Sequence, residues 1–117
     1  MPRYLFSVNH EDGEVLMTPE RQQRAWDDTG AFNDRLEGLG ALVFAGGLVP
    51  VDRAYVVDNR DDAGSVTAGP AIDATRRLGG FWIVDAPDDA TAQAWALEAS
   101  KACNEPVEVR PFMGSEG

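Results

Sequence analysis

Apolar residues along this chain follow two spacings, and each spacing indicates a different kind of element. Five short runs are rich in aromatic and β-branched side chains, which is typical of strands. They cover residues 4–8, 41–49, 54–57, 78–84 and 107–110. The run at 41–49 is apolar almost throughout and contains Gly46 and Gly47, which predicts a strand buried on both faces and closely approached by another backbone. Residues 65–67 are expected to pair with residues 54–57 as a hairpin.

Two longer segments repeat their apolar residues every three or four positions, which is the period of a helix with one buried side. The first begins with Thr18 as N-cap and Pro19 at the first helical position, where the missing N–H costs nothing. It is expected to end near Gly38 or Gly40. Its predicted sheet-facing residues are Trp26, Thr29, Phe32, Leu36 and Leu39.

The second helix is expected to follow the strand at 78–84, with Asp85 or Asp88 as its N-cap and Asn104 at its end. Its predicted buried residues are Ala92, Trp95, Ala99, Ala102 and Cys103. The element order is therefore β-α-β, a hairpin, and β-α-β again. This order predicts an α+β fold, a ferredoxin-like split βαβ sheet with a hairpin insertion and both helices on one face. We expect one domain over residues 1–112 and a flexible tail over residues 113–117.

The charge of the chain restricts its partners. Twenty acidic residues against ten basic residues leave a net charge of -10, which repels phosphate backbones and leaves no basic stripe for them. We therefore expect no nucleic acid partner. No apolar run is long enough for a membrane span or for the apolar region of a secretory signal, so we expect no membrane association and a cytoplasmic location.

Several short motifs occur in a fixed order. Residues 69–75 form a tight Gly-Pro turn and a polar link, and Leu78-Gly79-Gly80-Phe81 then opens a strand. Residues 87–89 form an acidic helix start, and Val107-Glu108-Val109-Arg110-Pro111 is the last strand. This order resembles the signature of the YCII-related, DGPF-type family.

The resemblance implies an assembly and two kinds of function. YCII-like proteins form homodimers whose sheets face each other in a dimeric α+β barrel, which covers the sheet face that lacks helices. Better-studied members are proposed to use a His/Asp pair, whose positions fall near Thr29 and at Asp52 in this chain, so the histidine is missing. The signature turn also differs, with Ala68 and Ala71 in place of Asp and Phe. DGPF-type genes often lie beside genes for extracytoplasmic-function sigma factors, which implies a regulatory partner.

Four polar residues are the candidates for a ligand site. His10, the only histidine, is predicted in the loop after the first strand, either as a general base near neutral pH or as a solvated surface residue. Asp52 follows the second strand. Asp73 and Arg76 lie at the signature turn, either orienting a ligand or, for Arg76, forming a surface ion pair. These strand ends are expected to converge at the mouth of the space between the sheet and its partner.

Metals and cofactors are not expected. The sequence contains no metal-ligand spacing, no nucleotide-binding glycine pattern and no hydrolase elbow. Gly79 and Gly80 lack the third glycine and the following helix that phosphate binding needs, so they predict close backbone packing at a strand start.

The sequence supports two hypotheses for function. The first is a small-molecule ligand bound between the facing sheets of a homodimer, in a pocket lined by aromatic residues as strand parity allows. These are Tyr4, Phe6, Phe44, Tyr55, Phe81 and Trp82. The second is a non-catalytic interaction module that works with an extracytoplasmic-function sigma factor. A cavity with a buried carboxylate favours the first hypothesis, and a filled barrel favours the second.

Overall fold

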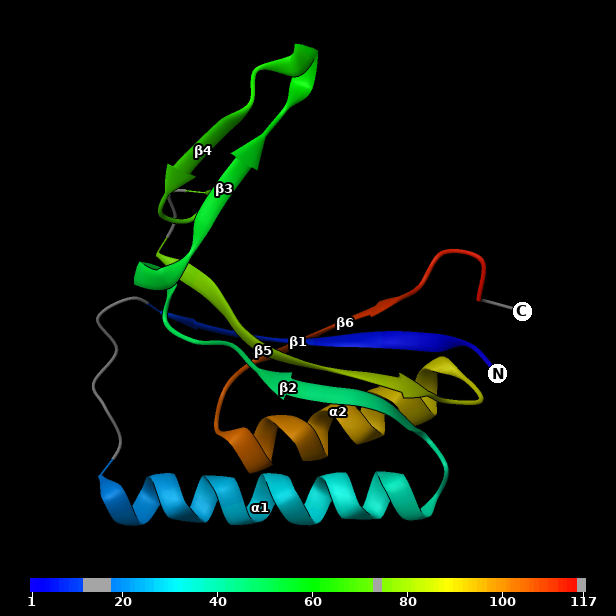
Figure 1. The fold of residues 1–117 in the computed structure, drawn as a ribbon. Coiled ribbons are helices and arrows are strands. Elements are labelled where there is room, and N and C mark those ends of the chain that lie inside the picture. The colour runs from blue at the N-terminus through cyan, green and yellow to red at the C-terminus, as the bar shows by residue number, and fades with distance from the viewer. Residues whose placement is uncertain (12–17, 73–74, 116–117) are drawn as a thin grey trace.

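A four-stranded sheet and two helices form the two layers of the domain in the computed structural model, which describes residues 1–11, 18–72 and 75–115 (Figure 1). A two-stranded ribbon extends from this body. The helices and strands in chain order are β1 (Arg3–Glu11), α1 (Pro19–Gly38), β2 (Leu42–Gly47), β3 (Tyr55–Asp58), β4 (Ser65–Ala68), β5 (Arg76–Asp85), α2 (Asp89–Cys103) and β6 (Val107–Pro111). Two single 3₁₀ turns, Val51–Arg53 and Arg60–Asp62, flank β3.

The strand order of the large sheet is β2-β5-β1-β6, and each neighbouring pair is antiparallel. Both helices lie on one face of this sheet (Figure 1). The predicted α+β, ferredoxin-like split βαβ fold is thus confirmed. β3 and β4 pair with each other and confirm the predicted hairpin insertion. Within the described ranges, neither helix combines the length and the apolar character needed to cross a membrane.

Both predicted helix starts show capping hydrogen bonds. The Thr18 hydroxyl accepts from the backbone N–H of Arg21 at 3.3 Å, and the Asp88 carboxylate accepts from that of Thr91 at 2.8 Å. The bond from Thr91 lowers the pKa of Asp88, because it favours the charged carboxylate. Asn104 ends α2 in the left-handed conformation, which asparagine tolerates better than most residues.

The core lies between the helices and the face of the sheet that they cover, called here the inner face. Phe6, Leu36 and Val84 are fully buried there, and each contributes roughly 1.5–3 kcal/mol by leaving water. The other buried apolar residues are Tyr4, Phe32, Ala41, Trp82, Ala86, Ala92, Ala96, Ala99 and Ala102. α2 buries four of these alanines, whose small side chains allow close packing.

Two residues of α1 that were predicted to face the sheet are exposed instead. Trp26 and Leu39 lie largely in solvent, whereas Phe32 and Leu36 are buried. α1 has 20 residues and is about 30 Å long, and its first turns extend beyond α2 (Figure 1). The neighbours that bury Phe32 and Leu36 therefore do not reach Trp26, and Leu39 lies at the C-cap, after the last helical residue.

Side-chain hydrogen bonds join each helix to the sheet. Trp82 Nε1–H donates to Asn33 Oδ1 at 2.6 Å, which links β5 to α1. The Tyr4 hydroxyl donates to the Asp89 carboxylate at 2.6 Å, which links β1 to α2. The bond to Asp89 raises the pKa of Tyr4 to about 12, because the carboxylate holds the phenolic proton. The Trp82 ring also meets Phe32 edge to face, with centroids 5.6 Å apart.

β1 and β5 are longer than the sequence predicted. β1 continues to Glu11 and β5 begins at Arg76, because these two ends pair with each other: His10 lies opposite Arg77 and Glu11 opposite Arg76. The prediction that His10 lies in a loop is therefore wrong. Pairing with a neighbouring strand, rather than apolar side chains, extends the strand here.

β2 lies at an edge of the sheet, and the prediction that it is buried on both faces is wrong. Val43 and Phe44 are exposed, because no described element covers the face of the sheet opposite the helices, called here the outer face. The predicted close backbone approach is confirmed. A Cβ atom on Gly80 would lie 3.0 Å from the carbonyl oxygen of Gly46 and 3.3 Å from the Cα of Gly47.

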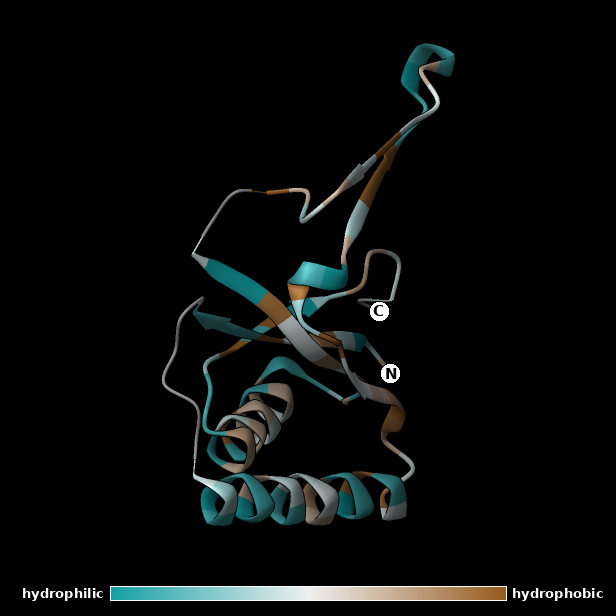
Figure 2. Ribbon diagram, turned by 60° about the vertical axis from the view of Figure 1, so that its left-hand side comes forward, coloured by the Kyte–Doolittle hydropathy of each residue, from teal (hydrophilic) through white to brown (hydrophobic). Residues whose placement is uncertain are grey.

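The ribbon of β3 and β4, called here the arm (residues 54–69), projects from the sheet on the side opposite the helices (Figure 1, Figure 2). Its strands pair only with each other. Figure 2 shows hydrophobic residues along both strands and hydrophilic residues at the tip.

The contact at Gly80 can be tested with alanine substitutions. We expect Gly80→Ala to lower the free energy of unfolding by about 1–3 kcal/mol, because the added Cβ forces β2 and β5 apart. Gly30→Ala in α1, whose Cβ would meet no atom within 4 Å, is expected to raise it by about 0.5–1 kcal/mol. Urea unfolding of both variants checks the prediction. A Gly80→Ala variant as stable as the unmodified protein would contradict the close approach at Gly80.

Candidate functional site

The outer face is the side of the sheet that the helices leave uncovered, and it carries exposed apolar residues. On β1, Tyr4 and Phe6 point to the inner core, so Leu5 and Ser7 lie on the outer face. The same alternation and the strand register place further residues of β2, β5 and β6 beside them. The resulting set is Leu5, Ser7, Phe44, Phe81, Ile83, Glu108 and Arg110. The outer face is thus apolar on β2 and β5 and polar on β6.

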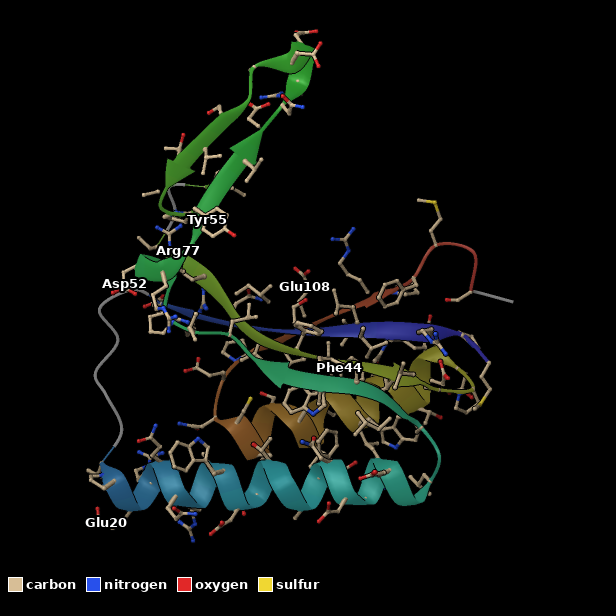
Figure 3. The ribbon with its side chains drawn as sticks, viewed as in Figure 1. Glu20, Phe44, Asp52, Tyr55, Arg77 and Glu108 are labelled. Carbon is tan, nitrogen blue, oxygen red and sulfur yellow. The ribbon has the colours of Figure 1, made fainter. Side chains whose placement is uncertain are left out.

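Phe44 and Phe81 form an aromatic pair on this face, called here the aromatic platform. Their ring centroids are 5.7 Å apart and the rings are inclined by 29°. A register shift between Leu42 and Phe44 turns Phe44 outward, beside Ile83. Its ring lies over Gly46, where a Cβ atom would come within 3.2 Å of it. Phe44 is 54% exposed, so the platform has a ring surface free to stack on another flat group (Figure 3).

Polar groups lie next to the platform. Ser7 is opposite Phe81 on one side and opposite Glu108 on the other, so these three residues form a row across β5, β1 and β6. Glu108 projects from β6 on the side away from the helices (Figure 3). The Ser7 hydroxyl can donate or accept a hydrogen bond, and an ionised Glu108 accepts only. Ser7 is buried, so the row presents an aromatic surface with Glu108 as its exposed hydrogen-bonding group.

The charges on the outer face cancel. Arg3 binds Asp85 through two hydrogen bonds, Nε to Oδ1 at 2.8 Å and Nη2 to Oδ2 at 3.1 Å. The hydrogen bonds from this guanidinium lower the pKa of Asp85. On β6, Glu108 and Arg110 bring one charge of each sign. Two acids and two bases thus balance on this face, in a chain whose net charge is -10.

His10 and Arg76 lie near each other at one end of the sheet, on neighbouring strands. The half-buried His10 ring packs on Gly79, where a Cβ atom would lie 2.5 Å from its Cδ2. Arg76 places Nη2 3.8 Å from Glu11 Oε1 and donates from Nη1 to the carbonyl oxygen of Asn9 at 3.4 Å. The surface ion pair that was one alternative for Arg76 is therefore present, and an exposed pair of this kind contributes about 1 kcal/mol or less.

The other two candidate residues are Asp52 and Asp73. Asp52 is exposed in the 3₁₀ turn Val51–Arg53, which follows β2 (Figure 3). β5 lies between β2 and β1, so it separates the strand that leads to Asp52 from the strand that carries His10. Asp73 lies outside the described residues. A common site of all four residues stays a prediction.

Strand alternation corrects the predicted pocket lining. Three of the six aromatic residues point to the inner core and cannot line a space on the outer face: Tyr4, Phe6 and Trp82. Phe44 and Phe81 do lie on the outer face. Tyr55 lies on the arm.

Ser7 and Glu108 were not among the candidates drawn from the sequence. The alternation of valine and charged residues in β6 was the available signal for Glu108, since the valines face the core. Nothing in the sequence distinguished Ser7 from any other serine in a strand, because its place beside Phe81 depends on the register of β1 and β5.

Hollows on the described surface occur along the helices. One of about 640 Å³ follows the first turns of α1, lined by Pro19, Glu20, Gln23, Arg24, Asp27 and Asp28. Another of about 450 Å³ lies between α1 and α2, beside the ion pair of Arg35 Nη1 and Glu98 Oε2 at 2.7 Å. Both are open to solvent. The residues described here contain no group of three His, Cys, Asp or Glu side chains placed to hold a metal ion.

A family model of the YCII-related domain matches residues 2–113. The match includes the whole sheet, both helices and the arm. No curated protein matches the chain. The function must therefore be argued from the site itself.

The packing of His10 on Gly79 can be tested with a double-mutant cycle. We expect Gly79→Ala to lower the free energy of unfolding by about 1–3 kcal/mol, because its Cβ collides with the imidazole ring. In a His10→Ala background, Gly79→Ala should lower the free energy of unfolding by at least about 0.5 kcal/mol less. This difference is the coupling expected for two residues in contact. Urea unfolding of the single and double variants measures this.

Gly80→Ala in the same His10→Ala background is the control for this cycle. Gly80→Ala should lower the free energy of unfolding equally with and without His10, because the added Cβ meets Gly46 and Gly47. Fully additive costs for Gly79→Ala and His10→Ala would contradict the contact.

Proposed function

The chain belongs to the YCII-related domain family, and on that premise we propose that it acts as a homodimer that binds a small molecule between two facing sheets. The observation that supports this proposal is the outer face, where a sheet without a helical cover exposes the aromatic platform. Removing such apolar surface from water contributes about 25 cal/mol per Å². Pairing two outer faces buries it in both copies at once.

The charge of the outer face also favours a second copy as the partner. A chain with a net charge of -10 repels another copy over most of its surface. On the outer face, Arg3 neutralises Asp85, and Arg110 lies on the same strand as Glu108. The balanced charges therefore reduce like-charge repulsion on the same face that carries the aromatic platform.

The platform and its polar neighbours suggest the class of ligand. A flat, largely apolar molecule stacks on the exposed ring of Phe44, as aromatic groups do at offset distances of about 4.5–7 Å. A hydrogen-bond donor on that molecule fits Glu108, which is exposed and lies in the same row as Phe81. The ligand we propose is thus a planar small molecule with a donor group at one edge.

His10, Asp52, Asp73 and Arg76 remain our proposed polar contacts at the mouth of this space. The closeness of His10 and Arg76 at one end of the sheet supports half of that group. Substitution of each residue by alanine, followed by measurement of ligand affinity, decides which of them belong to the site.

The second candidate function is a regulatory module that works with an extracytoplasmic-function sigma factor. The histidine of the family's His/Asp pair is missing near Thr29, which favours a function without catalysis. A dimer with a filled interior and no ligand affinity would support this candidate.

Dimer formation through the outer face can be tested with Phe44→Glu. We expect the unmodified chain to be a dimer at micromolar concentration and the variant to be a monomer, because two buried carboxylates would face each other without partners. Leu97→Glu is the control, since Leu97 is 74% exposed on α2 and this change should leave the dimer intact. Sedimentation velocity gives the mass, and circular dichroism confirms the fold of each variant. A monomeric unmodified chain would rule out the proposal.

Ligand binding can be tested with the neutral planar dye Nile red. We expect the dimer to bind the dye with an increase in fluorescence, and Phe81→Leu to weaken binding about two- to tenfold, as expected for the loss of one aromatic contact. Leu97→Ala serves as the control and should bind the dye as the unmodified dimer does. A stable dimer that binds no dye would favour the sigma-factor module instead.

A further inference from the structure

We propose that the arm is a clamp that packs against a second copy of the chain, so that each copy of the dimer holds the other beside the paired sheets. This inference rests on the proposed pairing of outer faces and adds a second contact to it. Two observations carry it. The arm has an exposed apolar face, and it stands on the side of the sheet where the second copy would dock.

The two faces of the arm differ in chemistry. Residues directly opposite each other in an antiparallel pair share a face, and here Tyr55 pairs with Ala68 and Val57 with Val66. These four residues form the apolar face of the arm, and Tyr55, Val57 and Val66 are 69%, 61% and 67% exposed. The opposite face is mostly polar and carries Val56, Asp58, Ser65 and Thr67. Such a separation of apolar and polar sides is typical of a strand pair that is covered on one side.

The tip of the arm is built from defined interactions. The Asp58 carboxylate accepts hydrogen bonds from the guanidinium of Arg60 at 2.7 Å and 3.0 Å and from its backbone N–H at 3.1 Å. The Asn59 side chain accepts from the backbone N–H of Gly64 at 2.9 Å. An isolated two-stranded hairpin is only marginally stable in water. A hairpin with a structured tip and a bare apolar face therefore needs a partner surface.

The position of the arm identifies that surface. Figure 1 and Figure 2 show the arm rising from the sheet on the outer side, away from both helices. Tyr55 lies at its base, and the three residue pairs beyond it extend about 10 Å further. A second sheet stacked on the outer face would lie about 10 Å away. With its tip at residues 59–64, the arm is thus long enough to reach the second sheet and rest against its flank.

The area needed by a stable dimer supports the same partner. The strands β1, β2, β5 and β6 hold 9, 6, 10 and 5 residues. At about 4.8 Å between strands and about 3.4 Å per residue they present a projected area of about 490 Å², whereas a typical stable interface buries about 800 Å² per partner. The ribbon adds about 130 Å² of projected area. In a two-fold dimer each copy both contributes an arm and receives one, so this addition counts twice. The outer face and the arms together approach the area of a stable interface, which the outer face alone does not reach.

Val66→Glu tests the clamp, with Thr67→Glu as its matched control. The two residues are neighbours on β4 and point to opposite faces of the arm. We expect Val66→Glu to raise the dissociation constant of the dimer at least tenfold and Thr67→Glu to change it less than twofold, as measured by sedimentation equilibrium. Because Val66 is exposed in a single copy, the substitution should leave the monomer folded, which circular dichroism verifies.

A photochemical cross-link tests the contact directly. p-Benzoylphenylalanine in place of Tyr55 is expected to give a covalent dimer on irradiation of the purified protein, with the link mapped by mass spectrometry to a different copy of the chain. p-Benzoylphenylalanine in place of Thr67 should give much less of the covalent dimer. Links confined to the same copy, or none, would overturn the clamp.

The two proposals fail in different ways. If Phe44→Glu separates the dimer and Val66→Glu does not, the clamp is wrong and the pairing of outer faces stands. If Val66→Glu separates the dimer and Phe44→Glu does not, the pairing of outer faces is wrong, and the arm is itself the contact. A chain that is monomeric without any substitution overturns both.

Discussion

Two helices cover one face of a four-stranded sheet and leave the other face to water, and this imbalance governs the rest of the molecule. Each strand must carry apolar residues on its inner side to hold the helices, as Phe6 and Val84 do. The outer side could be polar, as in many half-covered sheets. Here it carries Phe44, Phe81 and Ile83 instead. Apolar residues that the fold of one copy does not bury point to assembly, and they connect the architecture to the proposed function.

The element order and the fold class could be predicted from the sequence, because they depend on local signals. The Thr18 cap and the alternating valines of β6 each act through residues close in the sequence. The ends of strands could not be predicted in the same way. His10 belongs to β1 because Arg77 lies opposite it, and no property of the residues around His10 reveals that partner.

The candidate site was less predictable than the fold, because it depends on register. A shift of one residue turns every later side chain of a strand to the other face. The irregularity between Leu42 and Phe44 is such a shift, and it decides that Phe44 stands beside Phe81. The exposure of Trp26 has a similar origin, since helical period predicts a shared side but does not reveal where the neighbouring α2 ends.

The arm has an unusual place in the topology. β2 and β5, which flank it in the chain, are neighbours in the sheet, and their pairing continues to the point of departure, where Leu48 N–H donates to the carbonyl oxygen of Gly79 at 2.8 Å. Residues 49–78 are thus an insertion between β2 and β5, which otherwise form one long hairpin. Residues of this insertion can be added, removed or substituted without shifting the register of the sheet. Relatives built on the same domain are therefore free to differ in the length and composition of the arm.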